Sequence, residues 1–400
     1  MHLLRKISAI SLKTVISIIL IAVLAVIITS VSPIYRFKAP EPFSGPDVFN
    51  PYRNLDTALC WKRANFHTHT KVDGLLNECD YWPGEVHDAL KKFGYDIVTF
   101  SNHNRLTDHP FDESLQVNVY EHGYNLFKYH KLVFGSKDVN RFDNLLPLLA
   151  SQKQFQLWLL GKESDIIQYN HPLRTTGTSK SHMEKICGYD IMELDCGKST
   201  ENEFWDWALS AGHYSFGLAN DDLHYPDRTT KIARRCNFLC TPSATYPDIK
   251  DCLLDGCYYS MRIPDYGNGD WEIKTDKNLE LPRIENIGLR DSTIFISLSA
   301  TADSIKVFGQ NHSTLLLKKD TSYAEYTIQP GDSYARFTAY LPGGEVIYSN
   351  PFARYDAKVS DSPKKVPSYS VNIALTILFN TALLGLLALL FALLCKVIRR

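Results

Sequence analysis

Histidines and carboxylates recur between Ala64 and His224, where they stand at the ends of predicted strands. The groups are Phe66-His67-Thr68-His69, Ser101-Asn102-His103-Asn104, Gly135-Ser136-Lys137-Asp138, Asn170-His171-Pro172 and Asp221-Asp222-Leu223-His224. Neutral imidazole together with carboxylate is the ligand set of zinc, manganese and iron sites. Ligands drawn from many strand ends indicate a multinuclear catalytic centre rather than a structural metal clip.

No single group is specific by itself. An H-x-H pair such as His67 and His69 can be two histidines on a solvated strand end, and His103 alone could be a packing residue. His171-Pro172 alone fits a turn, and Asp222-Leu223-His224 alone fits a surface loop. The metal site is predicted from the conjunction, because groups of compatible chemistry recur at five successive places.

Short apolar segments that alternate with helix signals must position these groups. Strands are predicted at 63–68, 95–101, 131–136, 165–170, 189–194, 213–220 and 236–241. Helices are predicted from Pro83 to Gly94, from a Thr200–Glu203 capping box to Gly212, and from Pro247 to Gly256. This alternation favours a parallel sheet, open or closed into a barrel, whose strand C-terminal ends meet on one face.

The composition indicates a globular, strand-rich protein. The 400 residues carry a formal net charge of -1 and contain 12% aromatic residues, and their number suits about two domains. No basic block occurs, so nucleic acid is not expected as a partner. No P-loop or Rossmann glycine fingerprint occurs, so a nucleotide cofactor is not implied.

Two uncharged apolar segments, 14–35 and 371–395, are each long enough to cross a bilayer. The first follows Arg5, Lys6 and Lys13 and could be a cleaved signal peptide. Its long apolar run, without a clear A-x-A site, favours a retained signal anchor instead. Positive-inside reasoning, with Lys396, Arg399 and Arg400 after the second segment, places both termini in the cytoplasm and residues 36–365 outside. The expected location is therefore a membrane, with residues 36–365 on its non-cytoplasmic side.

The chain between the apolar segments divides into several parts. Residues 36–60 read as a Pro-rich spacer, residues 61–262 hold the candidate ligands, and residues 357–368 read as a second spacer. Residues 283–356 alternate apolar and polar positions between turn signals, which predicts a small all-β, immunoglobulin-like sandwich.

Eight of the nine cysteines fall between the two apolar segments. An even number in an exported domain permits disulfides. The candidate pairs are Cys187 with Cys196, and Cys236 with Cys240, Cys252 or Cys257, while buried free thiols are an equally weighted alternative. No C-x-x-C motif occurs, which argues against a cysteine-type zinc site.

The motifs in residues 61–262 resemble those of the PHP (polymerase and histidinol phosphatase) domain family of metal-dependent phosphoesterases. The matching metal ligands are His67, His69 and Asp73 in the first motif, His103 in the second, Asp138 as the bridging acid, His171 in the third, and Asp222 and His224 in the fourth. The resemblance implies a distorted seven-strand β/α (TIM-like) barrel with two or three divalent metal ions, either zinc, manganese or iron. The added β-sandwich and membrane helices resemble membrane-bound bacterial members.

The resemblance also implies a reaction, hydrolysis of a phosphate ester by a metal-activated hydroxide. Arg174 and Arg105 are candidate phosphate clamps, because a guanidinium matches two phosphate oxygens. A location outside the membrane makes a phosphorylated small molecule, a lipid headgroup or a glycan the candidate substrate. No role is assigned to six further histidines, namely His87, His109, His122, His130, His182 and His213.

The sequence departs from the family pattern at three places. Asn102 and Asn104 flank His103 where the family has Asp, and Asp138 stands where it usually has Glu. The family usually has a further histidine after the bridging acid, but none occurs in 140–147, where Asp143 is a possible substitute. These departures leave open a degenerate PHP module that binds a phosphorylated or glycan ligand without turnover. A hydrolase of C–N or C–O bonds is a third alternative, disfavoured because no strand-end lysine suits carboxylation.

Overall fold

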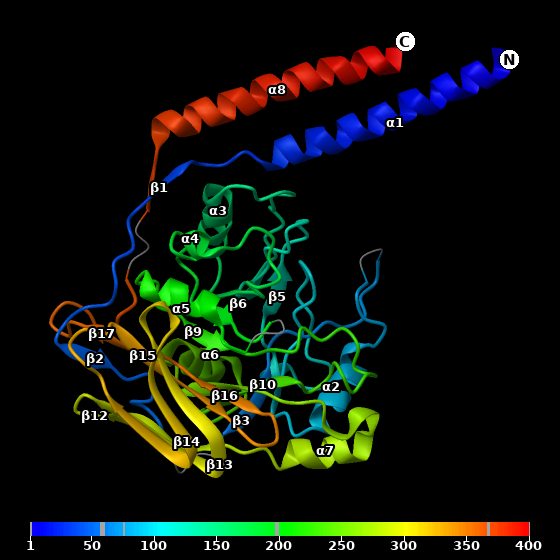
Figure 1. Ribbon diagram of the computed structural model, residues 1–400. Coiled ribbons are helices and arrows are strands. Elements are labelled where there is room, and N and C mark those ends of the chain that lie inside the picture. The colour runs from blue at the N-terminus through cyan, green and yellow to red at the C-terminus, as the bar shows by residue number, and fades with distance from the viewer. Residues whose placement is uncertain (1, 57–60, 75–76, 197–199, 366–368, 400) are drawn as a thin grey trace.

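The computed structural model describes residues 2–56, 61–74, 77–196, 200–365 and 369–399. The chain forms a mixed α/β body, and two long helices from its two ends lie side by side above it (Figure 1). Residues 57–60 of the predicted Pro-rich spacer, which include Cys60, residues 366–368 of the second spacer, and Arg400 of the basic flank lie outside the described residues.

One sheet consists of five short strands in chain order. They are β5 (Val119–His122), β6 (Lys131–Phe134), β7 (Ile166–Tyr169), β8 (Ile191–Glu193) and β9 (Phe216–Leu218). Every residue of these strands is buried, as in a strand that is covered on both faces. Strands β7, β8 and β9 are parallel, but β6 runs antiparallel to both β5 and β7. The start of β6 therefore lies at the sheet edge where β5 and β7 end.

A larger sheet combines the first strands of the predicted hydrolase region with the C-terminal strands. Its order is β12 (Ile284–Arg290), β13 (Thr293–Gly309), β15 (Tyr334–Tyr340), β16 (Val346–Ser349), β11 (Tyr258–Arg262), β10 (Arg235–Leu239), β3 (Lys62–Asn65) and β4 (Ile97–Val98). Off this path, β14 (Ser313–Thr327) pairs with β13, and β17 (Phe352–Tyr355) pairs with β15 and with β2 (Asp47–Phe49). Strands β3 and β4 are parallel, whereas β10 is antiparallel to β3 and β11.

The resemblance implied a distorted seven-strand β/α (TIM-like) barrel, but the described strands form no closed barrel. They fall into separate sheets, and the ends of β4 and β5 are linked by an isolated bridge between His103 and Glu121. Opposite this bridge, β9 approaches β11, where Ser260 Oγ donates a hydrogen bond to Gly217 O. The reversed strands β6 and β10 interrupt the parallel order, because each pairs antiparallel with both of its neighbours.

The C-terminal β region is joined to the rest of the protein by strand pairing and by a buried ion pair. Strand β16 pairs with β11 in antiparallel register, from Val346 opposite Arg262 to Ser349 opposite Tyr259. The guanidinium of Arg336 on β15 is fully buried and binds Asp206 of α5, with Nε 2.8 Å from Oδ1. This region is therefore all-β between β12 and β17, apart from the one-turn η3 (Gln310–His312), but its sheet is continuous with β10 and β11.

Helices fill the connections between the strands. They are α2 (Pro83–Lys91), α3 (Ala150–Leu160), α4 (Lys180–Met183), α5 (Glu203–Ser210), α6 (Tyr246–Asp255) and α7 (Trp271–Leu279). Helix α6 has Pro247 in its first turn and ends at Gly256, as predicted, with Gly256 at a φ of 81° that disfavours other residues. The predicted Thr200 cap is wrong. Asn202 is the N-cap of α5, in a left-handed conformation and without a side-chain cap.

The two terminal helices are α1 (His2–Thr29) and α8 (Ile373–Arg399). Leu20 and Leu24 of α1 and Leu394 of α8 are buried and belong to one apolar cluster. Beyond the helices, β1 (Tyr35–Phe37) pairs with β18 (Tyr369–Val371), and the Asn380 amide donates to Ser32 O. Both helices are long and apolar enough to cross a membrane, over Leu12–Thr29 and Ile373–Arg399. These two helices overlap the two apolar segments predicted from the sequence.

No disulfide joins the described cysteines. Cys187, Cys236 and Cys252 are among those that are buried, and Cys196 is partly exposed. None of the disulfides considered from the sequence is present among the described residues.

Candidate metal centre

Six strands bring the candidate ligands to one edge of the two sheets. His67 and His69 follow β3, His103 follows β4, Glu121 lies within β5, and His130 immediately precedes β6. The remaining groups follow later strands, with His171 after β7 and Asp222 and His224 after β9. Because β6 is reversed, residues at its start join residues at the ends of the parallel strands.

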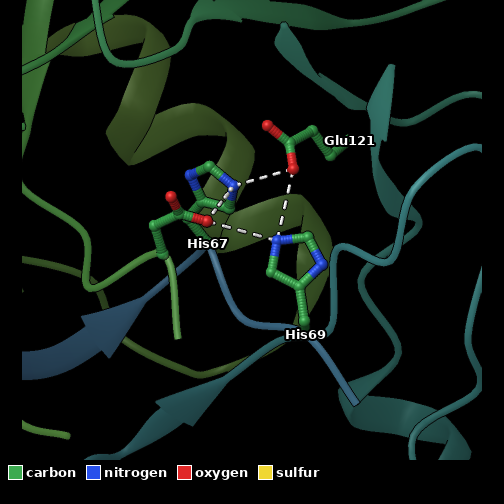
Figure 2. Close-up of side chains that lie close together, drawn as sticks. His67, His69 and Glu121 are labelled. Atoms are coloured by element: carbon green, nitrogen blue, oxygen red, sulfur yellow. Dashed lines mark ion pairs between the residues drawn. The ribbon is translucent and has the colours of Figure 1, made fainter. Parts of the chain in front are cut away.

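The most buried group is formed by His67, His69, Glu121 and Asp222. Figure 2 shows the two imidazoles converging on the Glu121 carboxylate. Glu121 Oε2 is 3.1 Å from His67 Nε2 and 3.2 Å from His69 Nε2, and Asp222 Oδ1 is 3.2 Å and 3.3 Å from the same atoms. The four ligand atoms all lie within 4.8 Å of one another, which is a spacing that one metal ion could bridge.

Two further groups share residues with the first one. In one of them, His103 Nε2 lies 3.2 Å from Glu78 Oε2, with His69 as the third member. In the other, Glu121 is 3.1 Å from both His103 Nε2 and His130 Nδ1. A further imidazole contacts this carboxylate, since His171 Nε2 lies 3.3 Å from Glu121 Oε1. Glu121 therefore belongs to two of the three groups, as a bridging carboxylate would.

The donor set fits divalent metal ions. His67 Nε2 and His69 Nε2 are fully buried, and neither has a hydrogen-bond partner despite the nearby carboxylate oxygens. Buried polar atoms without a partner are rare in proteins, because each one loses its interaction with water. A cation between the imidazoles and the carboxylates would satisfy these nitrogens, and imidazole with carboxylate suits zinc, manganese or iron.

Electrostatic interactions keep the carboxylates of the site charged. Burial disfavours the charged form of His67, but Glu121, Asp222 and Glu193 outweigh burial and raise the pKa of His67 well above its usual value. Burial also disfavours the charged form of His69, but Asp222 and Glu121 outweigh it and raise the pKa of His69 to about 9. Burial would raise the pKa of Glu121 and Asp222, but the surrounding imidazoles lower both well below the usual range. The cluster thus needs positive charge, which protons or metal ions can supply.

Glu193, at the end of β8, holds two of the histidines in place. Its Oε1 is 2.8 Å from His67 Nδ1, and its Oε2 accepts a hydrogen bond of 2.8 Å from the His171 backbone N–H. A carboxylate on the second nitrogen of a metal-binding histidine fixes the tautomer and leaves the first nitrogen free for the metal. Glu193 therefore directs His67 Nε2 toward Glu121 and Asp222.

The backbone is strained at two residues of the site. His171 has a φ of 27° and Asp222 a φ of 51°, in or near the left-handed region that residues other than glycine seldom adopt. Such conformations persist only where the surrounding structure imposes them, and they concentrate at functional sites. Here the strained turns bring the Asp222 carboxylate and the His171 ring toward Glu121.

Six of the eight metal ligands predicted from the sequence are brought together by the structure. They are His67, His69, His103, His171, Asp222 and His224. His224 is the outermost of them, with Nε2 3.8 Å from Glu78 Oε2.

The structure does not bring the other two predicted ligands into the cluster. Asp138 is exposed beyond the far end of β6, since that strand runs opposite to its neighbours. Asp73 is exposed in the loop after His69, and Glu78 in the same loop contacts His103 and His69 instead.

Sequence reasoning missed Glu121 and His130. It expected ligands only after parallel strands, whereas Glu121 lies inside a strand and His130 precedes one. The available signal was a glutamate in the otherwise strand-like run Val119-Tyr120-Glu121-His122, because a buried glutamate needs a charged partner. These two residues provide the glutamate and the further histidine that the family resemblance called for.

The other residues singled out in the sequence have different roles. Arg174 Nη1 binds Asp222 Oδ2, at the border of the site. Arg105 is exposed and donates a hydrogen bond of 3.4 Å to Asp73 O. Asn102 bonds to Thr70 through its amide oxygen and nitrogen and so braces the turn after β3.

Asp143, the suggested substitute ligand, lies outside the cluster. It accepts hydrogen bonds from the Tyr124 backbone N–H and from the side chains of Asn125 and Gln156. Of the histidines to which no role was assigned, His130 belongs to the cluster, whereas His122 bonds to Phe142 O.

Two cavities open beside the ligands. One, of about 430 Å³, is lined by His69, Glu78 and His103 together with Arg105 and Arg141. The other, of about 790 Å³, is bordered by Asp222 and His224 and extends past Arg174. The cluster is therefore accessible from two sides.

Comparison with known proteins gives one structural likeness. No family model matches the chain, and no curated protein matches it. A solved two-domain protein of Bacteroides vulgatus, described as containing a predicted PHP-like metal-dependent phosphoesterase, aligns with 78% of this chain and 99% of its own length. The identity is 16% and the TM-score is 0.38.

Proposed function

We propose that this protein is a metal-dependent phosphoesterase of PHP type. The observation that carries the proposal is the Glu121 carboxylate, which is buried among His67, His69, His103, His130 and His171. A carboxylate shared by groups of imidazoles is suited to holding two or three divalent ions close together, and such ions activate water and stabilise phosphoryl oxygens.

The chain's own residues would prepare this reaction. Glu193 orients His67, and the peptide N–H of His171 fixes Glu193 in turn. Arg174 lies at the mouth of the site on Asp222, where its guanidinium could bind phosphate oxygens of a substrate. The motif lacked a glutamate and a further histidine, which suggested a module without turnover. Glu121 and His130 are candidates for these two residues, because they lie together beside His103.

The first experiment measures metal content and hydrolysis together. The full chain is purified in detergent, its metals are counted by elemental mass spectrometry, and a panel of phosphomonoesters and phosphodiesters is screened. A His67→Ala/His69→Ala double variant should lose both the metal and the activity. A His87→Ala/His109→Ala double variant, with two histidines that contact each other outside the cluster, should retain both.

The screen also separates the alternatives. Two or three ions per chain together with hydrolysis support the proposal. Bound metal with no hydrolysis of any phosphate ester would contradict it and favour a module that only binds its ligand.

We further propose that α1 and α8 anchor the protein in a bacterial inner membrane, with residues 36–365 on the periplasmic side. The apolar length of both helices and their side-by-side packing support this arrangement. Protease added to spheroplasts should digest residues 36–365 while a tag on either terminus stays protected. Protection of this region until the cells are lysed would contradict the proposed orientation.

A further inference from the structure

The larger cavity beside the metal centre has a cationic wall. Its cationic side chains are Arg174, Lys231, Arg234, Arg235 and Arg262, and its carboxylates are Asp221 and Asp222. They come from the loop after β7, the loop between β9 and β10, the start of β10 and the end of β11. The smaller cavity differs, because Asp73 and Glu78 balance Arg105 and Arg141 there.

The carboxylates near this wall are already engaged. Asp195 is fully buried behind it and binds Arg235 Nε at 2.8 Å and Arg262 Nη1 at 3.2 Å. Asp221 accepts hydrogen bonds of 2.8–2.9 Å from three backbone N–H groups, those of Ala233, Arg234 and Arg235. Asp222 is shared between the histidines of the site and Arg174. These carboxylates offset part of the positive charge of Arg174, Arg235 and Arg262 and hold those side chains in place.

Two cations of the wall, Lys231 and Arg234, are held in no ion pair by the described carboxylates, although Asp265 and Asp221 act on Arg234 electrostatically. Hydrogen bonds from Arg234 Nε to Ile263 O and from Nη1 to Thr230 O hold its guanidinium in place. A fixed guanidinium loses little conformational entropy when it binds an anion, and its planar fork matches phosphate or carboxylate oxygens.

The cationic wall continues directly into the metal centre. Asp222 presents one oxygen to His67 and His69 and the other to Arg174, and the cavity beyond is large enough for a small ligand, at about 790 Å³. A substrate whose scissile phosphate binds metal ions held by Glu121 and Asp222 would therefore extend along the wall toward Arg234 and Lys231.

We infer that this cavity binds a second anionic group of the substrate, so that the enzyme prefers phosphate esters with a further phosphate or carboxylate. This inference rests on the proposed function and specifies its substrate class. Arg234 and Lys231 determine specificity in this arrangement, because they bind the distal anion.

The test compares three substrates that share one scissile ester. These are glycerol 1-phosphate, glycerol 1,3-bisphosphate and 3-phosphoglycerate, assayed with the full chain, the variants Arg234→Gln and Lys231→Gln, and the control Arg141→Gln in the smaller cavity. Each test variant should raise the KM for the bisphosphate by about tenfold, as expected for one lost charge-assisted hydrogen bond, and leave the KM for glycerol 1-phosphate unchanged. The response to 3-phosphoglycerate tells whether a carboxylate can replace the distal phosphate.

A binding measurement separates this inference from the proposed function. Titration of glycerol 1,3-bisphosphate into the protein, followed by ³¹P line broadening, should show weaker binding in Arg234→Gln than in Arg141→Gln even if no ester is hydrolysed. That result would support binding of a second anionic group in this cavity, even where the absence of hydrolysis contradicts the proposed function. Equal effects on the mono- and bisphosphate, or no effect of Arg234→Gln and Lys231→Gln on the bisphosphate, would overturn the inference.

Discussion

Replacing Glu121 by glutamine should remove most of the metal from this protein. The Glu121 side chain is 1% exposed and belongs to two of the three candidate metal groups. The amide keeps the shape of the side chain but removes its charge. A unit charge pair about 4 Å apart is worth ~4 kcal/mol at an effective dielectric constant of ~20, which corresponds to roughly thousandfold weaker binding.

The assay is elemental mass spectrometry after dialysis against metal buffers that just saturate the parent chain. Glu121→Gln should lose the ions of both groups that contain Glu121. Glu78→Gln should affect only the group that contains Glu78, since this residue is 42% exposed and lies at the edge of the cluster. Comparison of the two variants thus tests which carboxylate is shared.

Asp138→Asn is the matched control, because Asp138 is the carboxylate that the sequence motif indicated. It is exposed beyond the far end of β6, so its variant should keep the full metal content. If Asp138→Asn lost metal and Glu121→Gln kept it, the reasoning from the reversed direction of β6 would be refuted.

Three further outcomes are expected. Glu193→Gln should weaken metal binding by about 10–100-fold without emptying the site, because it disturbs the orientation of His67 but removes no ligand. A loss as large as that of Glu121→Gln would show that Glu193 binds metal itself. Chelation of the metals should lower the midpoint of thermal unfolding, since ions that bind only the native state stabilise it, and an unchanged midpoint would argue against a built metal site. Asp206→Ala should cost ~3–5 kcal/mol of unfolding free energy, because it leaves the buried Arg336 without its partner, whereas Asp206→Leu/Arg336→Met should recover most of it. Burial alone would raise the pKa of Asp206, but Arg336 lowers it. The pair therefore contributes its full stability above the unfolded pKa of about 3.9 and loses it as the pH falls through the lower folded pKa. A difference in stability between parent and variant that does not change with pH in acid would contradict this.

The chemistry of the candidate site and most of its candidate ligands follow from the sequence. His67, His69, His103, His171 and Asp222 were found because each comes just after an apolar strand, and the ends of neighbouring parallel strands lie close together. The two terminal helices follow equally directly, since a long uncharged apolar run has few other structures available. In these cases the information is local, carried by residue type and by spacing along the chain.

The direction of individual strands was decided only by the tertiary structure. Periodicity marks β6 as a strand but is the same for either direction, so Asp138 looked like a ligand while His130, at the other end, did not. The same limit applies to β10 and to the pairing of β16 with β11, which makes the β region continuous with the larger sheet. The cationic wall is a further case, because Arg174, Arg234 and Arg262 are far apart in sequence and meet only through strand order. Local pattern therefore determined which residues could bind metal, and strand direction and pairing determined which of them meet.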